Sequence, residues 1–128
     1  MAKVVVEAVL LLSTVAFGQD TGDLLTKYDK DLQANPKSSI AHFRLGEIYF
    51  QRGQFMEAGN AFREALTGDL QPNWVEVWSH LNLGKTFDST GQRERALNEY
   101  RLAIRTKDNT RGAVDEAEIY IQIPYPRK

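Results

Sequence analysis

The two histidines of the chain, His42 and His80, are the first candidates for acid–base chemistry or metal binding. Histidine exchanges a proton near neutral pH more readily than other side chains, and it is a common zinc ligand. The two lie 38 residues apart, the chain has no cysteine, and neither has a second histidine within one helical turn. Zinc motifs formed by one stretch of sequence place their ligands within a few residues of one another. We therefore expect both histidines to fill a structural position, and we expect no metal site.

Acidic and glycine-containing motifs give no stronger sign of catalysis. Asp115, Glu116 and Glu118 lie together at the start of an apolar stretch, where negative charge favours the first turn of a helix. Gly53 and Gly91 are each followed by glutamine, without the Gly-rich run and the Lys-Ser/Thr pair of a phosphate-binding loop. The sequence therefore predicts no catalytic residue, no cofactor and no enzymatic activity.

Both histidines belong to a longer segment that occurs twice. Residues 40–66 and 78–104 align without a gap at an offset of 38, and nine of the 27 positions are identical. Three further positions keep their chemical character, in the pairs Tyr49/Phe87, Phe62/Tyr100 and Leu66/Ile104. Such self-similarity at a fixed period indicates a repeat protein.

Apolar residues within each copy recur at the spacing of a helix. The first copy has two such stripes, formed by Leu45, Ile48 and Tyr49 and then by Ala58, Phe62 and Ala65. They predict a helix over residues 39–52 and a second helix shortly after Gly53. Gly46 is small where the second helix must approach, and Gly53 can adopt a positive φ at a helix end without steric cost.

The flanking segments look like partial repeats. Residues 23–34 carry Leu24, Leu25, Tyr28 and Leu32 at helical spacing, and Asn35-Pro36 then stops the helix. Near the other end Ala113, Ala117, Tyr120 and Ile121 share one face of a predicted helix that Pro124 and Pro126 end. We expect this last helix to cap the array.

The order of residues within each copy resembles the tetratricopeptide repeat. The family pattern is filled twice, by Leu45, Gly46, Tyr49, Gly53, Ala58, Phe62 and Ala65 and by Leu83, Gly84, Phe87, Gly91, Ala96, Tyr100 and Ala103. The resemblance implies an all-α fold class, a right-handed superhelical array of helical hairpins with about six helices. The period exceeds the family's usual value of about 34 by four residues. We place the excess in residues 67–73, either as a longer second helix of the first repeat or as a longer connection.

Residues 1–18 resemble a bacterial secretory signal peptide, with a basic start, an apolar run and small residues at Ala16 and Gly18. The apolar run is shorter than the roughly 20 residues of a membrane span. We therefore expect a periplasmic or secreted protein with no membrane attachment once the leader is removed. The alternative is a cytoplasmic protein whose uncleaved N-terminal helix has a dimerising face. The expected organisation is a signal peptide (1–18) and a repeat domain (19–128) that comprises a degenerate half repeat (23–36), repeats 39–70 and 77–108, and a capping helix (112–122).

The resemblance also implies a binding groove, because the first helix of each family repeat lines a concave surface that takes a peptide. The implied groove residues are Phe43, Glu47, Phe50, Trp78, Asn82 and Lys85, with Asp88 next on the same face. Trp78 and Phe50 are the expected anchors, since buried aromatic residues dominate binding energies. Alternatively, Trp74 and Trp78 pack the junction between repeats. Phe43 and Glu47 replace the Lys and Asn of the family's carboxylate clamp, so we do not expect acidic chaperone-type tails as ligands.

Charge gives no sign of a nucleic-acid partner. The net charge is −1, and basic residues alternate with acidic ones, as in Arg93-Glu94-Arg95. A nucleic-acid site needs a clustered basic face. The predicted function is therefore that of a non-catalytic adaptor for a protein or peptide ligand. The alternatives are a structural module that forms a homo-oligomer and an accessory or carbohydrate-binding domain, the last supported only by exposed aromatic residues.

Signal peptidase is expected to cleave the chain before Gln19, because the apolar run ends in small residues at the two positions that the enzyme reads. Mass spectrometry of the protein purified from its native host measures the N-terminus directly. A mature species that still begins at Met1 or Ala2 would contradict the predicted export.

Overall fold

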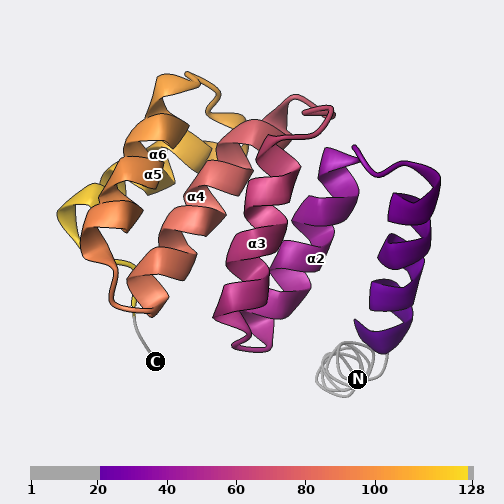
Figure 1. Ribbon diagram of the computed structural model, residues 1–128. Coiled ribbons are helices and arrows are strands. Elements are labelled where there is room, and N and C mark those ends of the chain that lie inside the picture. The colour runs from indigo at the N-terminus through magenta and orange to yellow at the C-terminus, as the bar shows by residue number, and fades with distance from the viewer. Residues whose placement is uncertain (1–20, 127–128) are drawn as a thin grey trace, which may run out of the picture.

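The chain forms an all-α array of helical hairpins in the computed structural model, which describes residues 21–126 (Figure 1). A helix over residues 21–34 is followed by α2 (Ser39–Gln51), α3 (Phe55–Leu66), α4 (Trp74–Ser89), α5 (Arg93–Arg105), the short 3-10 turn η1 (Thr110–Gly112) and α6 (Ala113–Gln122). The described residues contain no strand, so the predicted all-α repeat fold is confirmed. No helix in this range is both long and apolar enough to span a bilayer. The predicted leader lies outside the described residues.

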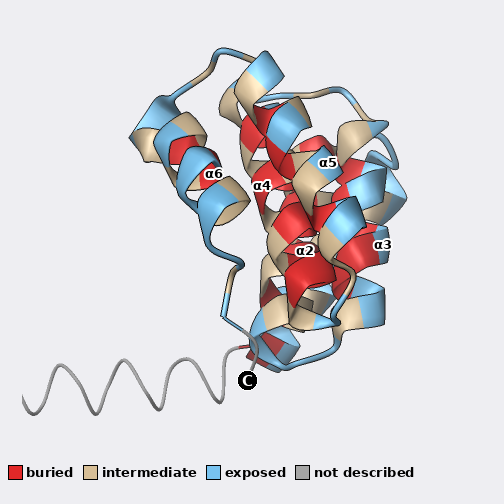
Figure 2. Ribbon diagram, turned by 90° about the vertical axis from the view of Figure 1, so that its left-hand side faces the viewer, coloured by how far each residue is buried: buried red, intermediate tan, exposed pale blue. Residues whose placement is uncertain are grey.

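The helices pack in two layers. Figure 2 shows α2 and α4 side by side in one layer, α3 and α5 in the next, and α6 on the far side of α4. Buried side chains of α2 to α6 form one continuous core, with Phe62, Leu81 and Tyr100 among the fully buried residues. The helix over residues 21–34 lies beside α2, where Thr21 accepts a hydrogen bond from Arg52 Nη2 at 2.7 Å.

Each hairpin is held together by a glycine beneath an aromatic ring. A Cβ added to Gly46 would lie 2.5 Å from a ring carbon of Phe62, and a Cβ on Gly84 would meet the ring of Tyr100 just as closely. Only glycine permits this approach of α2 to α3 and of α4 to α5. The turns between the paired helices use Gly53 (φ 74°) and Gly91 (φ 76°), as the sequence predicts, because L-residues with side chains rarely adopt such values.

The four extra residues of the first repeat do not lengthen its second helix. α3 has 12 residues and its counterpart α5 has 13, so that alternative is wrong. α2 begins six residues before Leu45, whereas α4 begins nine residues before Leu83. Part of the excess therefore adds nearly one turn to the start of α4, an arrangement that neither predicted alternative included. The rest lies in the connection 67–73.

The connection 67–73 is fixed against the start of α2. The Ser39 hydroxyl donates to the Ala65 carbonyl at 2.6 Å and accepts from the Leu70 N–H at 2.9 Å. Asp69 accepts from the N–H groups of Gln71 and Ser39, and these hydrogen bonds lower the pKa of its carboxyl group below the ordinary value. The start of α4 is therefore placed by hydrogen bonds to the preceding repeat.

Because both glycines lie in close contact with a ring, a single added methyl group should strongly reduce the stability of the fold. Gly46→Ala or Gly84→Ala should lower the free energy of unfolding by about 1 to 3 kcal/mol, because the facing ring must move in a packed core. Urea denaturation followed by circular dichroism measures the change. Gly59→Ala in α3 is the matched control, since its added Cβ would meet its nearest neighbour at an ordinary 3.8 Å. That substitution should be neutral or stabilising, because alanine favours helix more than glycine does. Equal stability of all three variants would contradict the proposed contact.

Candidate functional site

Five of the six predicted groove residues line one cavity between α2 and α4. The cavity measures about 220 Å³, and its walls are formed by Glu47, Phe50, Gln51, Phe62, Trp78, Asn82, Lys85 and Tyr125. Each of the five predicted residues is half-buried, with part of its side chain accessible. Phe62 and Tyr125 were not expected there. Phe62 reaches the cavity from α3, and Tyr125 reaches it from the segment after α6.

Phe43 does not lie in this groove, so that part of the prediction is wrong. Its side chain is only 2% exposed and packs against Phe62 and Trp74, with ring centroids 5.8 and 5.5 Å away. The physical reason is the added turn of α4, which brings Trp74 over the face of α2 that carries Phe43. Trp74 therefore packs the junction between the repeats, as the alternative interpretation of the tryptophans holds.

Trp78 both lines the groove and fixes the end of the array. Its indole N–H donates to the Thr110 carbonyl in η1 at 3.0 Å, and its ring face contributes to the cavity wall. Each interpretation therefore holds for one of the two tryptophans. Trp74 packs the junction between the repeats, and Trp78 lies in the groove.

Lys85 is surrounded by three aromatic rings and one carboxylate. Its ammonium group lies 2.7 Å from Glu116 Oε1 and 5.9, 5.5 and 5.4 Å from the ring centroids of Trp78, Tyr120 and Tyr125. A cation over aromatic faces at these distances is attracted by their negative charge density. Burial and the negative charge of Glu116 raise the pKa of Tyr120 to about 12. Lys85 therefore joins α4, α6 and the following segment on one side of the groove.

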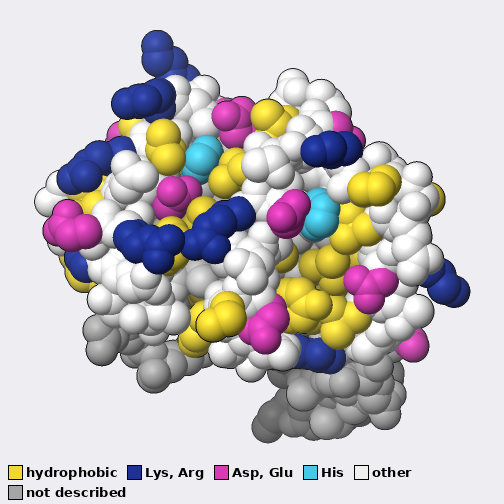
Figure 3. All heavy atoms as spheres, viewed as in Figure 1, with side chains coloured by type: hydrophobic (Ala, Val, Ile, Leu, Met, Phe, Trp, Pro, Cys, Tyr) yellow, Lys and Arg dark blue, Asp and Glu magenta, His cyan; other side chains and the backbone are white. Residues whose placement is uncertain are grey.

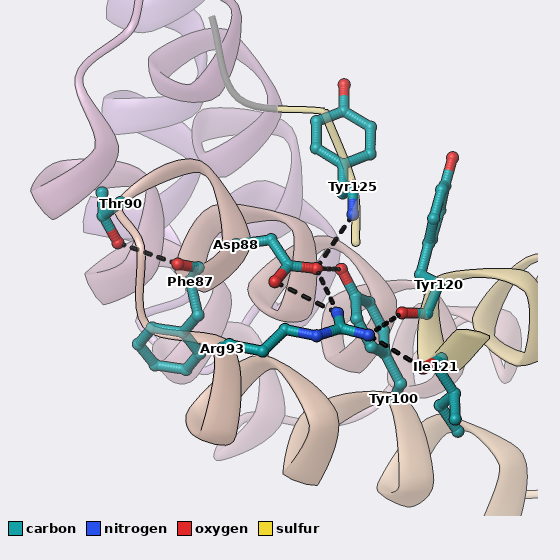
Figure 4. A network of polar contacts seen from close by, with 8 residues as sticks. All are labelled: Phe87, Asp88, Thr90, Arg93, Tyr100, Tyr120, Ile121 and Tyr125. Atoms are coloured by element: carbon teal, nitrogen blue, oxygen red, sulfur yellow. Dashed lines mark hydrogen bonds and ion pairs between the residues drawn. The ribbon is translucent and has the colours of Figure 1, made fainter. Parts of the chain in front are cut away.

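A buried carboxylate lies beside this cluster. Asp88 is 3% exposed, and its carboxylate accepts hydrogen bonds from Arg93 Nη1 at 2.9 Å, the Tyr100 hydroxyl at 2.7 Å and the Tyr125 N–H at 3.0 Å (Figure 4). Arg93 Nη2 in turn donates to the carbonyls of Tyr120 and Ile121 at the end of α6. Cationic donors at a helix C-terminus satisfy its free carbonyl groups and its dipole. The network thus holds the capping helix to the second repeat.

The first repeat has no such network, because phenylalanine occupies all three of its positions. At the offset of 38, Asp88, Arg93 and Tyr100 correspond to Phe50, Phe55 and Phe62. The rings of Phe50 and Phe55 contact each other edge to face with centroids 5.4 Å apart. The same place in the hairpin is therefore apolar in the first repeat and ionic in the second.

The two histidines have different partners, and neither contributes to a metal site within residues 21–126. His42 Nε2 lies 3.2 Å from the Pro36 carbonyl, and His80 Nδ1 lies 3.0 Å from Glu99 Oε1. Both contacts join a first helix to a neighbouring segment, which fits the structural role that the sequence analysis gave them. The His80–Glu99 contact also lies at the edge of the cleft on the opposite face.

The opposite face has a larger cleft over α3, α4 and α5. It encloses about 680 Å³, and Arg63 and Arg95 lie there over the ring of Phe87 at 5.5 and 4.2 Å. Arg63 donates to Asn60 and Arg95 to Gln92, so both guanidinium groups already have partners on their own helices. Figure 3 shows basic and acidic side chains interspersed over this face, without a continuous patch of one sign. The groove between α2 and α4 differs from this cleft in that two half-buried aromatic side chains, Phe50 and Trp78, form part of its walls.

Besides Gln51 and Phe62 in the groove wall, sequence reasoning missed Glu116, Tyr120 and Tyr125 as site residues. It interpreted Glu116 as a helix-start residue and Tyr120 as part of the cap, and it gave Tyr125 no role. Each contacts Lys85 across more than 30 residues of sequence. The only available signal was the pair of tyrosines flanking the proline-rich end of the capping helix.

Comparison with known proteins supports the repeat interpretation. Residues 40–69 and 79–110 match the tetratricopeptide repeat family. A segment of 48 residues is 40% identical to the human protein named tetratricopeptide repeat protein 6. That segment is 38% of this chain and only 9% of the human protein.

Because of the contacts around Asp88, we expect the folded state to become less stable at high pH. Burial, and then the hydrogen bond to Asp88 and its negative charge, raise the pKa of Tyr100 far above the ordinary value. An unfolded tyrosine ionises near pH 10, so the stabilisation is fully present below about pH 10 and is lost as the pH rises further. We expect the free energy of unfolding to fall above about pH 10, and Tyr100→Phe to make that fall shallower. At neutral pH the same substitution should cost about 1 to 3 kcal/mol. Urea denaturation at a series of pH values tests both, and identical alkaline slopes would contradict the assignment.

Proposed function

Because residues 40–69 and 79–110 match the tetratricopeptide repeat family, we propose that the chain is a non-catalytic adaptor that binds an extended peptide or protein segment in the groove between α2 and α4. Tetratricopeptide repeats generally mediate protein–protein interactions. The observation that carries the proposal is the convergence of Glu47, Phe50, Trp78, Asn82 and Lys85 on one cavity. Phe50 and Trp78 supply apolar contact area and the other three supply polar groups, and binding sites commonly combine the two.

The groove offers both anchoring and orienting contacts. Phe50 on α2 and Trp78 on α4 present partly exposed aromatic surface. Asn82 lies between Trp78 and Lys85 along α4. An asparagine side chain can donate to and accept from a peptide main chain. Aromatic residues of a partner would bury area against the two rings, and the amide would set the direction of the bound segment.

Self-assembly is the second candidate, and exposed apolar residues favour it. Met56, Ile119 and Ile123 are 79%, 57% and 67% exposed. A homo-oligomer would bury these separate side chains, and removal of apolar surface from water favours association. Sedimentation of the purified chain over a concentration series separates the candidates, because only self-assembly gives a concentration-dependent dimer without a partner.

We also propose that the protein acts outside the cytoplasm, in the periplasm or after secretion. The support is the pattern of residues 1–18 alone, a basic start followed by an apolar run and small residues before Gln19. Partners are accordingly sought in periplasmic extract.

Groove binding predicts which substitutions weaken the complex. With a partner captured from periplasmic extract and then purified, Phe50→Ala and Trp78→Ala should each lower affinity by about 2 kcal/mol or more, as losses of anchors commonly do. Isothermal titration calorimetry measures the change, after circular dichroism has shown that each variant is folded. Arg63→Glu, on α3 at the opposite face, is the control and should change affinity by less than about 0.5 kcal/mol. Loss of binding in Arg63→Glu with full binding in Trp78→Ala would move the site to the opposite face.

A further inference from the structure

The segment after α6 places one of its own side chains in the groove. The ring of Tyr125 contacts Phe50 and Tyr120 edge to face, with centroids 5.9 and 5.3 Å apart. It thereby forms a wall of the 220 Å³ cavity and also of a neighbouring cavity of about 540 Å³. Tyr125 thus occupies the place where an aromatic residue of a partner would meet the proposed anchor Phe50.

The main chain of this segment is also bound beside the groove, through a hydrogen bond from Tyr125 to Asp88. Proline has no N–H, so Tyr125 carries the only main-chain donor within residues 124–126. That N–H donates to Asp88 Oδ2 at 3.0 Å. Pro126 also restricts Tyr125 to an extended conformation, which reduces the conformational entropy lost when the segment docks. One buried carboxylate therefore meets the single donor of a Pro-Tyr-Pro sequence.

The attachment is local. Ile123, Pro124 and Pro126 are all exposed, and only Tyr125 is half-buried. Ile123 continues the end of α6, where its N–H donates to the Ile119 carbonyl at 2.9 Å. Beyond Ile123 the segment is held by one side chain and one hydrogen bond, so it opens far more easily than the core does. When it leaves, Asp88 keeps Arg93 and Tyr100, so the capping helix remains attached. The face of Phe50 and one acceptor site on Asp88 then become available.

From these contacts we propose that residues 123–126 are a built-in ligand of the groove, and that the partner is an extended segment of the same chemistry. Such a segment has an aromatic residue between prolines, whose ring packs on Phe50 beside Lys85 and whose N–H donates to Asp88. A partner binds by displacing Tyr125. This inference rests on the proposed function of the groove and names the class of peptide that the groove takes.

Displacement has a measurable consequence for affinity. A tethered segment competes at an effective concentration of the order of millimolar. The apparent affinity for a free peptide falls in proportion to the fraction of molecules whose groove is open. Removing the Tyr125 ring should therefore raise the affinity for a peptide that carries the same ring.

The test uses the full chain and a fluorescent hexapeptide with the sequence of residues 123–128, Ile-Pro-Tyr-Pro-Arg-Lys. Fluorescence anisotropy should show that Tyr125→Ala binds the peptide at least about tenfold more tightly than the unaltered chain does. Tyr125→Phe is the matched control, because it keeps the ring that contacts Phe50 and should bind as weakly as the unaltered chain. A peptide with alanine in place of tyrosine should not bind any of the three. Circular dichroism shows that the variants remain folded.

Three results would overturn the inference. The first is equal binding, or no binding, of the tyrosine peptide by Tyr125→Ala and the unaltered chain. The second is equal binding of the tyrosine and alanine peptides by Tyr125→Ala. The third is a dimer of the unaltered chain that Tyr125→Ala converts to monomer, because the segment would then occupy a second copy and not its own groove.

The test of the built-in ligand and the test of the proposed groove function can fail independently of each other. If the captured partner depends on Phe50 and Trp78 but binds the unaltered chain and Tyr125→Ala equally, the groove function stands and the built-in ligand is overturned. If the partner ignores Phe50 and Trp78, the groove function fails, and the peptide titration still decides whether Tyr125 competes for the groove.

Discussion

The close approach of paired helices at Gly46 and Gly84 is the constraint on which the remaining structure depends. Each glycine lies beneath an aromatic ring, Phe62 in the first hairpin and Tyr100 in the second. Each ring rests directly on the backbone of the first helix of its hairpin. Phe62 thereby becomes part of the groove wall, and the Tyr100 hydroxyl reaches Asp88. A wider hairpin would move Phe62 away from the groove and the Tyr100 hydroxyl away from Asp88, which would keep only Arg93 and Tyr125 as donors.

The two repeats differ at three equivalent positions, and the difference decides which kind of contact holds each hairpin to its neighbours. The first repeat has Phe50, Phe55 and Phe62 where the second has Asp88, Arg93 and Tyr100. An aromatic cluster packs against almost any apolar neighbour, whereas a buried carboxylate requires donors at defined places. The charged pair gives no assured gain in stability, since desolvation offsets much of the attraction. Its contribution is directional, because it fixes where the capping helix and Tyr125 lie. The end of the array is thus specified by polar contacts, and its interior by packing.

The sequence predicted the features that depend on local pattern. Helix boundaries near Ser39 and Gln122, the turns at Gly53 and Gly91, and five groove residues all follow from periodicity and from the register of the repeat. Phe43 was misplaced because the added turn of α4, and with it the position of Trp74, depends on how residues 67–73 fold back on Ser39. Glu116, Tyr120 and Tyr125 were missed because their contacts with Lys85 join distant segments, and neither spacing nor composition reports such contacts. Repetition reveals what two copies share, while these residues belong to the end of the array alone.

The separation of the two tryptophans has an optical consequence. Trp74 packs on Phe43 between the repeats, whereas Trp78 lines the groove near Lys85. These are the only indoles of the chain, so its ultraviolet emission combines one signal from the packed junction with one from the groove. Replacing Trp74 by phenylalanine would leave a single intrinsic fluorophore in the groove wall. The chain then carries its own reporter of whether water, its own tyrosine or a foreign segment lies beside that indole, and no attached dye is required.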